Sequence, residues 1–195
     1  MSKSTEQAIY LASKSPRRQE LLKQIGIEFQ LVDIDVGETP ADGEAAIDYV
    51  RRLAIEKSQA GVAKREGVAP VLGSDTIVVL DGRIMEKPAD KANAIEMLMA
   101  LSGNTHQVMT AIALSDNEQT LSEVVITNVT FCQISEQQAS AYWYTGEPAD
   151  KAGGYAIQGL AGKFVEKIEG SYFAVVGLPL LETQRLVNKI FAPQS

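Results

Sequence analysis

The segment from Pro70 to Asp81 (PVLGSDTIVVLD) predicts a long β-strand, with apolar runs on both sides of a short polar interruption at 73–76. An aspartate within an apolar strand is costly to bury unless it is hydrogen-bonded, bound to metal or at the rim of a site. Asp75 therefore marks a functional site or, as the structural alternative, a bulge or sheet edge where it caps a turn. The pair Asp81-Gly82 predicts a hairpin into a short strand at 83–85.

Strands and helices alternate around this segment, which favours a mixed α/β fold with a long twisted sheet flanked by helices. No internal repeat or low-complexity linker divides the chain. The expected strands are 9–12, 28–35, 70–81, 83–85, 106–114, 121–134, 164–168 and 172–176. The expected helices are 19–25, 44–64, 89–101, 135–145 and 180–190, and the glycine-rich stretch 147–159 is expected to be a loop.

The segment Ser13 to Arg18 (SKSPRR) joins the first strand to the first helix and predicts an anion site. Ser15 is a good N-cap, and Pro16 suits the first helical position because its missing N–H would have no partner there. The helix start thus combines backbone N–H groups, a positive dipole end, cationic side chains and two hydroxyls, which is how a chain binds phosphate. The alternative is a capped surface helix with solvated arginines.

Lys57 lies four residues after Leu53 and seven after Val50, on the apolar stripe of its helix. A lysine at such a position either extends along the apolar surface to reach water or points into a cleft. A lone lysine more often extends to reach water. The helical pattern alone does not exclude that Lys57 points into a cleft.

Composition excludes several classes of function. The net charge of −7 leaves no general basic surface for a nucleic-acid backbone, so a polyanion would need a local pocket of cations. One cysteine and one histidine exclude an internal disulfide and a His/Cys zinc site. The first residues are polar and no apolar run approaches about 20 residues, so we expect a soluble cytoplasmic protein without a membrane segment or signal peptide.

The polar residues in unexpected places are cations and carboxylates. The chain has no phosphate-binding loop of the GxxxxGK[ST] type and no GxGxxG dinucleotide motif. Hard oxygen donors beside fixed positive charge suit Mg²⁺ or Mn²⁺ and a phosphorylated ligand. The residues concerned are Arg17, Arg18, Lys57, Lys87, Glu38, Asp75 and Glu86.

Several motifs together resemble the Maf family of nucleoside triphosphate pyrophosphatases. The resemblance covers nearly the whole chain, in the order and spacing of the family. The motifs are Ser13-x-Ser15-Pro16-Arg17-Arg18, Gly73-Ser74-Asp75-Thr76, Glu86-Lys87-Pro88, Leu101-Ser102-Gly103, Asp150-Lys151-Ala152-Gly153, Gly170-Ser171-Tyr172 and Val176-Gly177-Leu178-Pro179.

This resemblance implies one domain over residues 1–195, with an inosine-triphosphatase-like fold of two lobes around a cleft. It implies hydrolysis of dTTP and UTP to the monophosphate and pyrophosphate, by metal-assisted attack of water, as housekeeping of the nucleotide pool. A divalent cation (Mg²⁺ or Mn²⁺) and a homodimer are also implied. The alternatives are the same chemistry on 7-methyl-GTP or another modified nucleotide, and a nucleotide-binding regulator of cell division.

The resemblance also assigns roles by position. Asp75 is expected to be the catalytic carboxylate and, with Glu38, to hold the metal, while Glu86 supports the site. Arg17, Thr76 and Gln158 are the expected specificity residues. The expected phosphate-binding residues are Ser13, Arg17, Arg18, Lys57 and Lys87.

Gln158 lies in the run Gly154 to Gly159 (GYAIQG), which looks like the subgroup that acts on dTTP and UTP. A sister subgroup that prefers 7-methyl-GTP has an acidic residue at this position. Because a glutamine amide offers one acceptor and two donors, it complements the alternating C=O and N–H groups of uracil or thymine. An acidic side chain would offer acceptors only.

Overall fold

The computed structural model describes residues 8–192. These residues divide into two compact units, which agrees with the expectation of two lobes. The first unit comprises residues 8–75, 110–124 and 177–192, and the second comprises 76–109 and 125–176.

A mixed sheet runs in the order β2-β1-β3-β5-β6-β7, with β4 paired to β3. Strand β1 pairs in parallel with β2 and β3, whereas β4 is antiparallel to β3 and β7 is antiparallel to β6. The expected mixed α/β fold is therefore confirmed. The strands are β1 (Ile9–Leu11), β2 (Phe29–Leu31), β3 (Val71–Leu80), β4 (Arg83–Met85), β5 (Thr105–Ser115), β6 (Thr120–Phe131) and β7 (Val165–Glu169).

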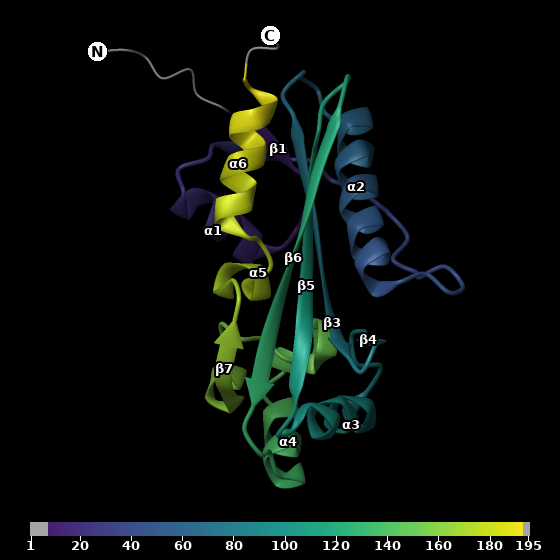
Figure 1. The fold of residues 1–195 in the computed structure, drawn as a ribbon, viewed down its shortest axis with the longest axis vertical. Helices are drawn as coiled ribbons and strands as arrows, with labels where there is room; N and C mark the ends of the chain where they lie inside the picture. The colour runs from purple at the N-terminus through teal and green to yellow at the C-terminus, as the bar shows by residue number, and fades with distance from the viewer. Residues whose placement is uncertain (1–7, 193–195) are drawn as a thin grey trace. The chain divides into compact units, whose positions relative to one another are not determined.

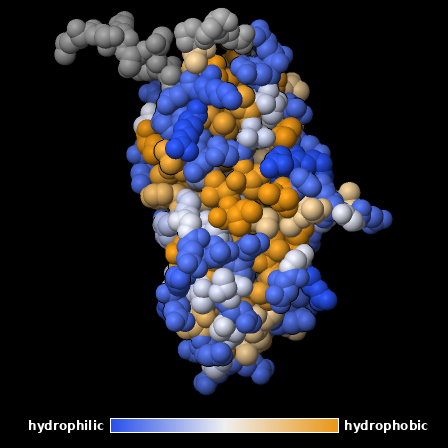
Figure 2. Space-filling model, viewed as in Figure 1, coloured by the Kyte–Doolittle hydropathy of each residue, from blue (hydrophilic) through white to orange (hydrophobic). Residues whose placement is uncertain are grey.

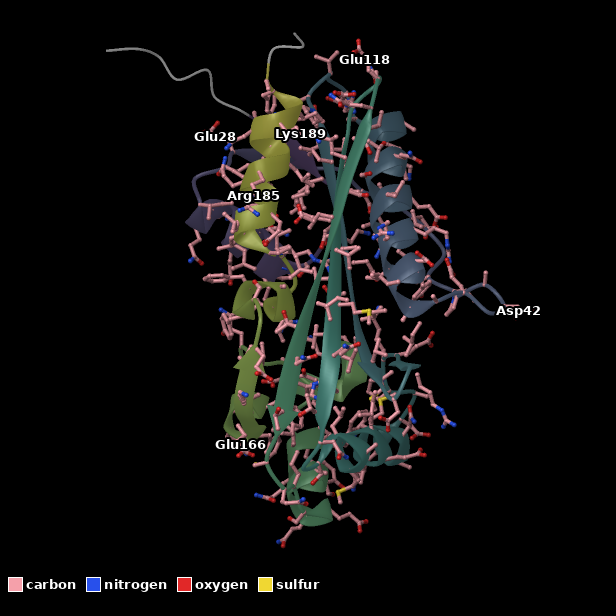
Figure 3. The ribbon with its side chains drawn as sticks, in the orientation of Figure 1. Glu28, Asp42, Glu118, Glu166, Arg185 and Lys189 are labelled. Atoms are coloured by element: carbon pink, nitrogen blue, oxygen red, sulfur yellow. The ribbon has the colours of Figure 1, made fainter. Side chains whose placement is uncertain are left out.

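Three helices belong to the first unit: α1 (Pro16–Gln24), α2 (Ala46–Lys64) and α6 (Leu180–Ile190). Figure 1 shows α1 and α6 on one side of the strands of this unit and α2 on the other. In α6 the buried residues recur at helical spacing, and the opposite face carries Arg185 and Lys189, labelled in Figure 3. Hydrophilic residues cover that visible face in Figure 2.

Helix α2 approaches the backbone of β3 closely at Gly73. A Cβ atom there would lie 2.3 Å from the carbonyl oxygen of Ala54 and 2.6 Å from the backbone nitrogen of Ser58. Both contacts are with helix backbone, which cannot move aside cheaply. Glycine at the start of the GSDT motif therefore allows α2 to lie directly on the strand that carries Asp75.

The second unit contains α3 (Lys91–Leu101), α4 (Glu136–Trp143) and α5 (Tyr172–Val176), with short 3₁₀ turns at η1 (Glu147–Asp150), η2 (Ala152–Gly154) and η3 (Leu160–Phe164). A capping box at Ser135 and Gln138 begins α4. None of the helices within residues 8–192 is long and apolar enough to cross a bilayer.

The core of the second unit includes a buried aromatic cluster around His106, which is 2% exposed. Its ring packs edge-on against Phe131 at 5.0 Å and Tyr155 at 5.4 Å, and its Nε2 hydrogen-bonds the Tyr155 hydroxyl at 2.7 Å. Nδ1 is buried without a hydrogen-bond partner among the described residues. This surrounding favours the neutral ring, and burial lowers the pKa of His106 to about 4.

We expect the stability of the chain to fall as the pH drops from about 6.5 to about 4. In this window the unfolded chain binds a proton at His106 that the folded chain does not, which lowers the free energy of unfolding by about 3 kcal/mol in total. Urea unfolding at several pH values measures the slope. Because the sequence has a single histidine, His106→Gln should flatten this part of the profile. An unchanged slope in that variant contradicts the assignment.

Three local expectations are wrong. Residues 172–176 form helix α5 rather than a strand, since Ser171 caps it by accepting from the Ala174 backbone N–H at 3.2 Å. Residues 73–76 do not interrupt β3, which continues from Val71 to Leu80. The glycine-rich stretch 147–159 is ordered by the turns η1 and η2.

Candidate active site

In the first unit, two carboxylates meet the Lys57 ammonium. Its Nζ donates to Glu38 Oε1 at 2.6 Å and to Asp75 Oδ1 at 2.7 Å. Lys57 and Asp75 are each 8% exposed, so this part of the cluster is nearly removed from water. Lys57 therefore does not extend along apolar surface to reach solvent. It holds two acidic groups together that would otherwise repel one another.

Lys57 and Asp75 come from a helix and a strand of the first unit. Lys57 lies on the buried face of α2 with Val50 and Leu53, at helical spacing. Asp75 lies within β3, where the neighbouring Ser74 is fully buried and donates its hydroxyl to the carbonyl of Gly177 at 3.2 Å. Asp75 lies inside the continuous strand β3 and accepts from Lys57 of α2, so it does not cap a turn.

Glu38 comes from the loop between β2 and α2, and Arg52 of α2 anchors that loop. The guanidinium binds the Glu44 carboxylate through Nε and Nη2, both at 2.7 Å, and Nη2 also donates to the Thr39 carbonyl at 3.1 Å. The Arg52 hydrogen bonds are the main reason why the pKa of Glu44 is lowered to about 2. Asp42 lies at the exposed tip of the loop in Figure 3, beyond this anchored part.

Arg18 connects the N-terminal motif to the same unit. Its Nε donates to the Gly177 carbonyl at 2.9 Å and its Nη1 to the Ser13 hydroxyl at 3.2 Å. Burial lowers the pKa of Arg18, and the negative charges of Asp75 and Glu38 oppose that shift. Since an arginine stays charged in proteins, a fixed positive charge lies within electrostatic reach of both carboxylates.

Arg17 and the start of α1 complete this group. Ser15 is the N-cap residue, as predicted, but its side chain makes no capping hydrogen bond, and Pro16 occupies the first turn. Within the part of the chain that the structure describes, Arg17 makes no hydrogen bond or ion pair. The helix start therefore offers backbone donors and an uncommitted cation to an anionic ligand.

The remaining predicted residues belong to the second unit. Thr76 is half-buried in β3, while Glu86 and Lys87 follow β4 and are exposed. The Gly153 backbone N–H donates to the Glu86 carbonyl at 3.1 Å, which places this segment beside the turn that leads to the exposed Gln158.

The predicted residues thus form two sets. The first unit joins Ser13, Arg18, Glu38, Lys57 and Asp75 through contacts with each other or with shared partners, and it also carries Arg17. The second unit carries the other four: Thr76, Glu86, Lys87 and Gln158.

Two contributions to the first set were not predicted from the sequence. The Gly177 carbonyl accepts hydrogen bonds from both Arg18 and Ser74, and Arg52 anchors the loop of Glu38. A backbone acceptor 159 residues from its donor leaves no local pattern. Arg52 and Glu56 have the i,i+4 spacing of helix neighbours, but Glu44 lies before the helix and eight residues from Arg52.

The donor chemistry of the first unit fits a divalent cation. Residues 8–192 contain no cluster of three or more His, Cys, Asp or Glu side chains suited to a metal ion. Glu38 and Asp75 nevertheless supply two hard carboxylates around one ammonium. Mg²⁺ commonly binds one or two carboxylates and takes its remaining ligands from water and substrate phosphates. Such a pair therefore fits a cation that binds together with a phosphorylated ligand.

A family model described as "Maf-like protein" matches residues 8–190, which include every residue of both sets. A Salmonella typhimurium protein named dTTP/UTP pyrophosphatase is 58% identical, over 92% of this chain and 91% of its own length. Proteins of the same name from Pseudoalteromonas translucida and Saccharophagus degradans are 55% and 52% identical, over 93% and 95% of this chain and 96% and 90% of their own lengths. Among solved structures, the Staphylococcus aureus Ham1 protein is 22% identical, covers 66% of this chain and 72% of its own, and has a TM-score of 0.45.

Proposed function

Because the chain belongs to the Maf family, we propose that it is a pyrophosphatase that hydrolyses dTTP and UTP to the monophosphate and pyrophosphate. One observation carries the proposal: a lysine between two carboxylates, with an arginine within electrostatic reach, lies in the region that matches proteins named for this activity.

The first unit supplies groups suited to each part of this reaction. A triphosphate has about four negative charges near neutral pH, and attack on phosphorus requires that charge to be offset. Ser13, Arg17, Arg18 and the start of α1 bind and orient phosphates in this proposal. Lys57 hydrogen-bonds Oδ1 of Asp75, which leaves Oδ2 to orient a water molecule and accept its proton.

Glu38 and Asp75 would hold the divalent cation, Mg²⁺ or Mn²⁺ by their donor chemistry. When bound, such a cation offsets phosphate charge and makes a coordinated water more acidic. Lys57 keeps both carboxylates in place, since it contacts each of them at 2.7 Å or less. Lys87, with Glu86 as its acidic neighbour, is proposed as a further phosphate-binding residue.

Product analysis tests this function. Purified protein incubated with dTTP or UTP and Mg²⁺ or Mn²⁺ should release dTMP or UMP and one equivalent of pyrophosphate. Release of orthophosphate, or tight triphosphate binding without turnover, would contradict the proposal, and the second result would favour a nucleotide-binding regulator.

Base selection is proposed to depend on Gln158, with Arg17 and Thr76 as further specificity residues. Replacing Gln158 with glutamate removes its donors, so the ratio of kcat/KM for dTTP to that for 7-methyl-GTP should fall by about tenfold or more. Side-by-side kinetics on both substrates measure the ratio. The matched control is Gln137→Glu, an exposed position in α4. Equal effects of the two substitutions would exclude Gln158 from base reading.

The proposal extends to the assembly and location of the chain. Residues 1–195 act as one functional domain, the protein is a homodimer, and it works on the cytoplasmic nucleotide pool. The family resemblance supports all three statements. Light scattering on the purified protein measures the number of chains in the assembly directly.

A further inference from the structure

The loop that carries Gln158 is anchored immediately before it. Tyr155, Ala156 and Ile157 are buried, whereas Gln158 is exposed. The Ala156 backbone N–H donates to the Tyr142 hydroxyl at 3.2 Å. Tyr142 is 1% exposed and belongs to α4, so a rigid element of the second unit fixes this side of the loop.

The same loop is anchored immediately after Gln158 by Glu147 of η1. The Leu160 backbone N–H donates to Glu147 Oε2 at 3.0 Å, and the Ala161 N–H donates to Oε1 at 3.4 Å. The Tyr142 hydroxyl donates to Oε1 of the same carboxylate at 2.5 Å. Tyr142 and Glu147 therefore form one hydrogen-bonded link that joins both sides of Gln158.

The charge of Glu147 suits this role. Burial raises its pKa, but the hydrogen bonds from Tyr142, Leu160 and Ala161 outweigh burial and leave the pKa below its usual value. An ionised carboxylate only accepts, and it can accept from several donors at once. The hydrogen bonds to the ionised Glu147 carboxylate are charge-assisted, so they are stronger than the same bonds to a neutral amide would be.

Gly159 provides the space for the carboxylate. A Cβ atom at Gly159 would lie 2.4 Å from Glu147 Oε2 and 2.6 Å from Glu147 Cδ. A side chain at 159 would push the carboxylate away from the Leu160 and Ala161 N–H groups. The absence of a side chain at Gly159 thus leaves room for the Glu147 carboxylate beside the loop.

We propose that Tyr142 and Glu147 are positioning residues for base selection. They hold the backbone on both sides of Gln158, so that its amide meets the pyrimidine edge in one orientation. Neither residue contacts the substrate in this account; they act through the loop. The inference rests on the proposed function, because it assumes that Gln158 reads the base.

Substrate selectivity is the decisive readout, since a merely destabilised enzyme loses activity on all nucleotides equally. Glu147→Gln and Tyr142→Phe should each lower the ratio of kcat/KM for dTTP to that for 7-methyl-GTP by about tenfold, through a raised KM for dTTP. Glu166→Gln is the control, because Glu166 is an exposed carboxylate of β7, labelled in Figure 3. It should keep the ratio of the unsubstituted protein.

Hydrogen exchange gives a readout that does not depend on activity. Backbone amides of residues 156–161 should exchange faster in Glu147→Gln and in Gly159→Ala, with exchange in α3 unchanged. An unchanged selectivity ratio in Glu147→Gln, in an enzyme that hydrolyses dTTP, overturns this inference alone. A chain without turnover of dTTP or UTP overturns the proposed function, and the inference with it.

Discussion

Replacement of Asp75 by asparagine is expected to lower kcat for dTTP by about 10²- to 10⁴-fold, the usual contribution of a general base. The amide cannot accept a proton from water. It also keeps the shape of the carboxylate, so the side chain can still fill its place in β3. The hydrogen bond from Lys57 Nζ to Oδ1 can persist, since an amide oxygen is also an acceptor.

Two further measurements make the Asp75 result specific. Thermal unfolding should show a folded Asp75→Asn protein, which separates lost chemistry from lost structure. Asp42→Asn provides the matched control, because Asp42 lies at the exposed tip of a loop and should keep full activity (Figure 3). Full activity of Asp75→Asn would remove Asp75 from the catalytic role.

Replacement of Lys57 by methionine should affect both stability and activity. Without the ammonium, Asp75 and Glu38 lose their shared partner and face each other as like charges. Removing one member of a buried ion pair costs about 3 kcal/mol or more. Urea unfolding should show this loss, and dTTP turnover should fall with it. Lys64→Met, an exposed position at the end of α2, is the control and should change neither.

A second substitution distinguishes like-charge repulsion from loss of packing. In Lys57→Met with Glu38→Gln only one of the two carboxylates remains, so part of the lost stability should return. Activity should not return, because the proposed metal ligand Glu38 is also gone. If the double variant is as unstable as Lys57→Met alone, repulsion between Asp75 and Glu38 is not the cause of the loss.

Patterns local in the chain predicted much of this site. Asp75 was recognisable because it is a carboxylate within an otherwise apolar strand, and Lys57 because it occupies an apolar helical stripe. Both patterns arise from burial, and both residues are buried. The helical and strand patterns could not show that Lys57 contacts Asp75, because the two residues belong to different elements and lie 18 positions apart.

Contacts between irregular segments that are distant in the sequence could not be predicted from local sequence patterns. Glu147 follows a glycine in a turn and has nothing in its surroundings that marks it as an acceptor for residues 160 and 161. Residues 172–176 contain the β-favouring run YFAVV, yet the cap at Ser171 makes them helical. Short apolar runs do not distinguish a strand from a helix by periodicity, and a local hydrogen bond decided this case.

The most direct test of the proposed site is a crystal structure with Mg²⁺ and an α,β-imido analogue of dTTP, which the enzyme cannot hydrolyse between these phosphates. We expect the phosphates at Ser13, Arg17 and Arg18 and the cation on Asp75 and Glu38. A nucleotide bound away from Asp75 and Arg18 would contradict the account.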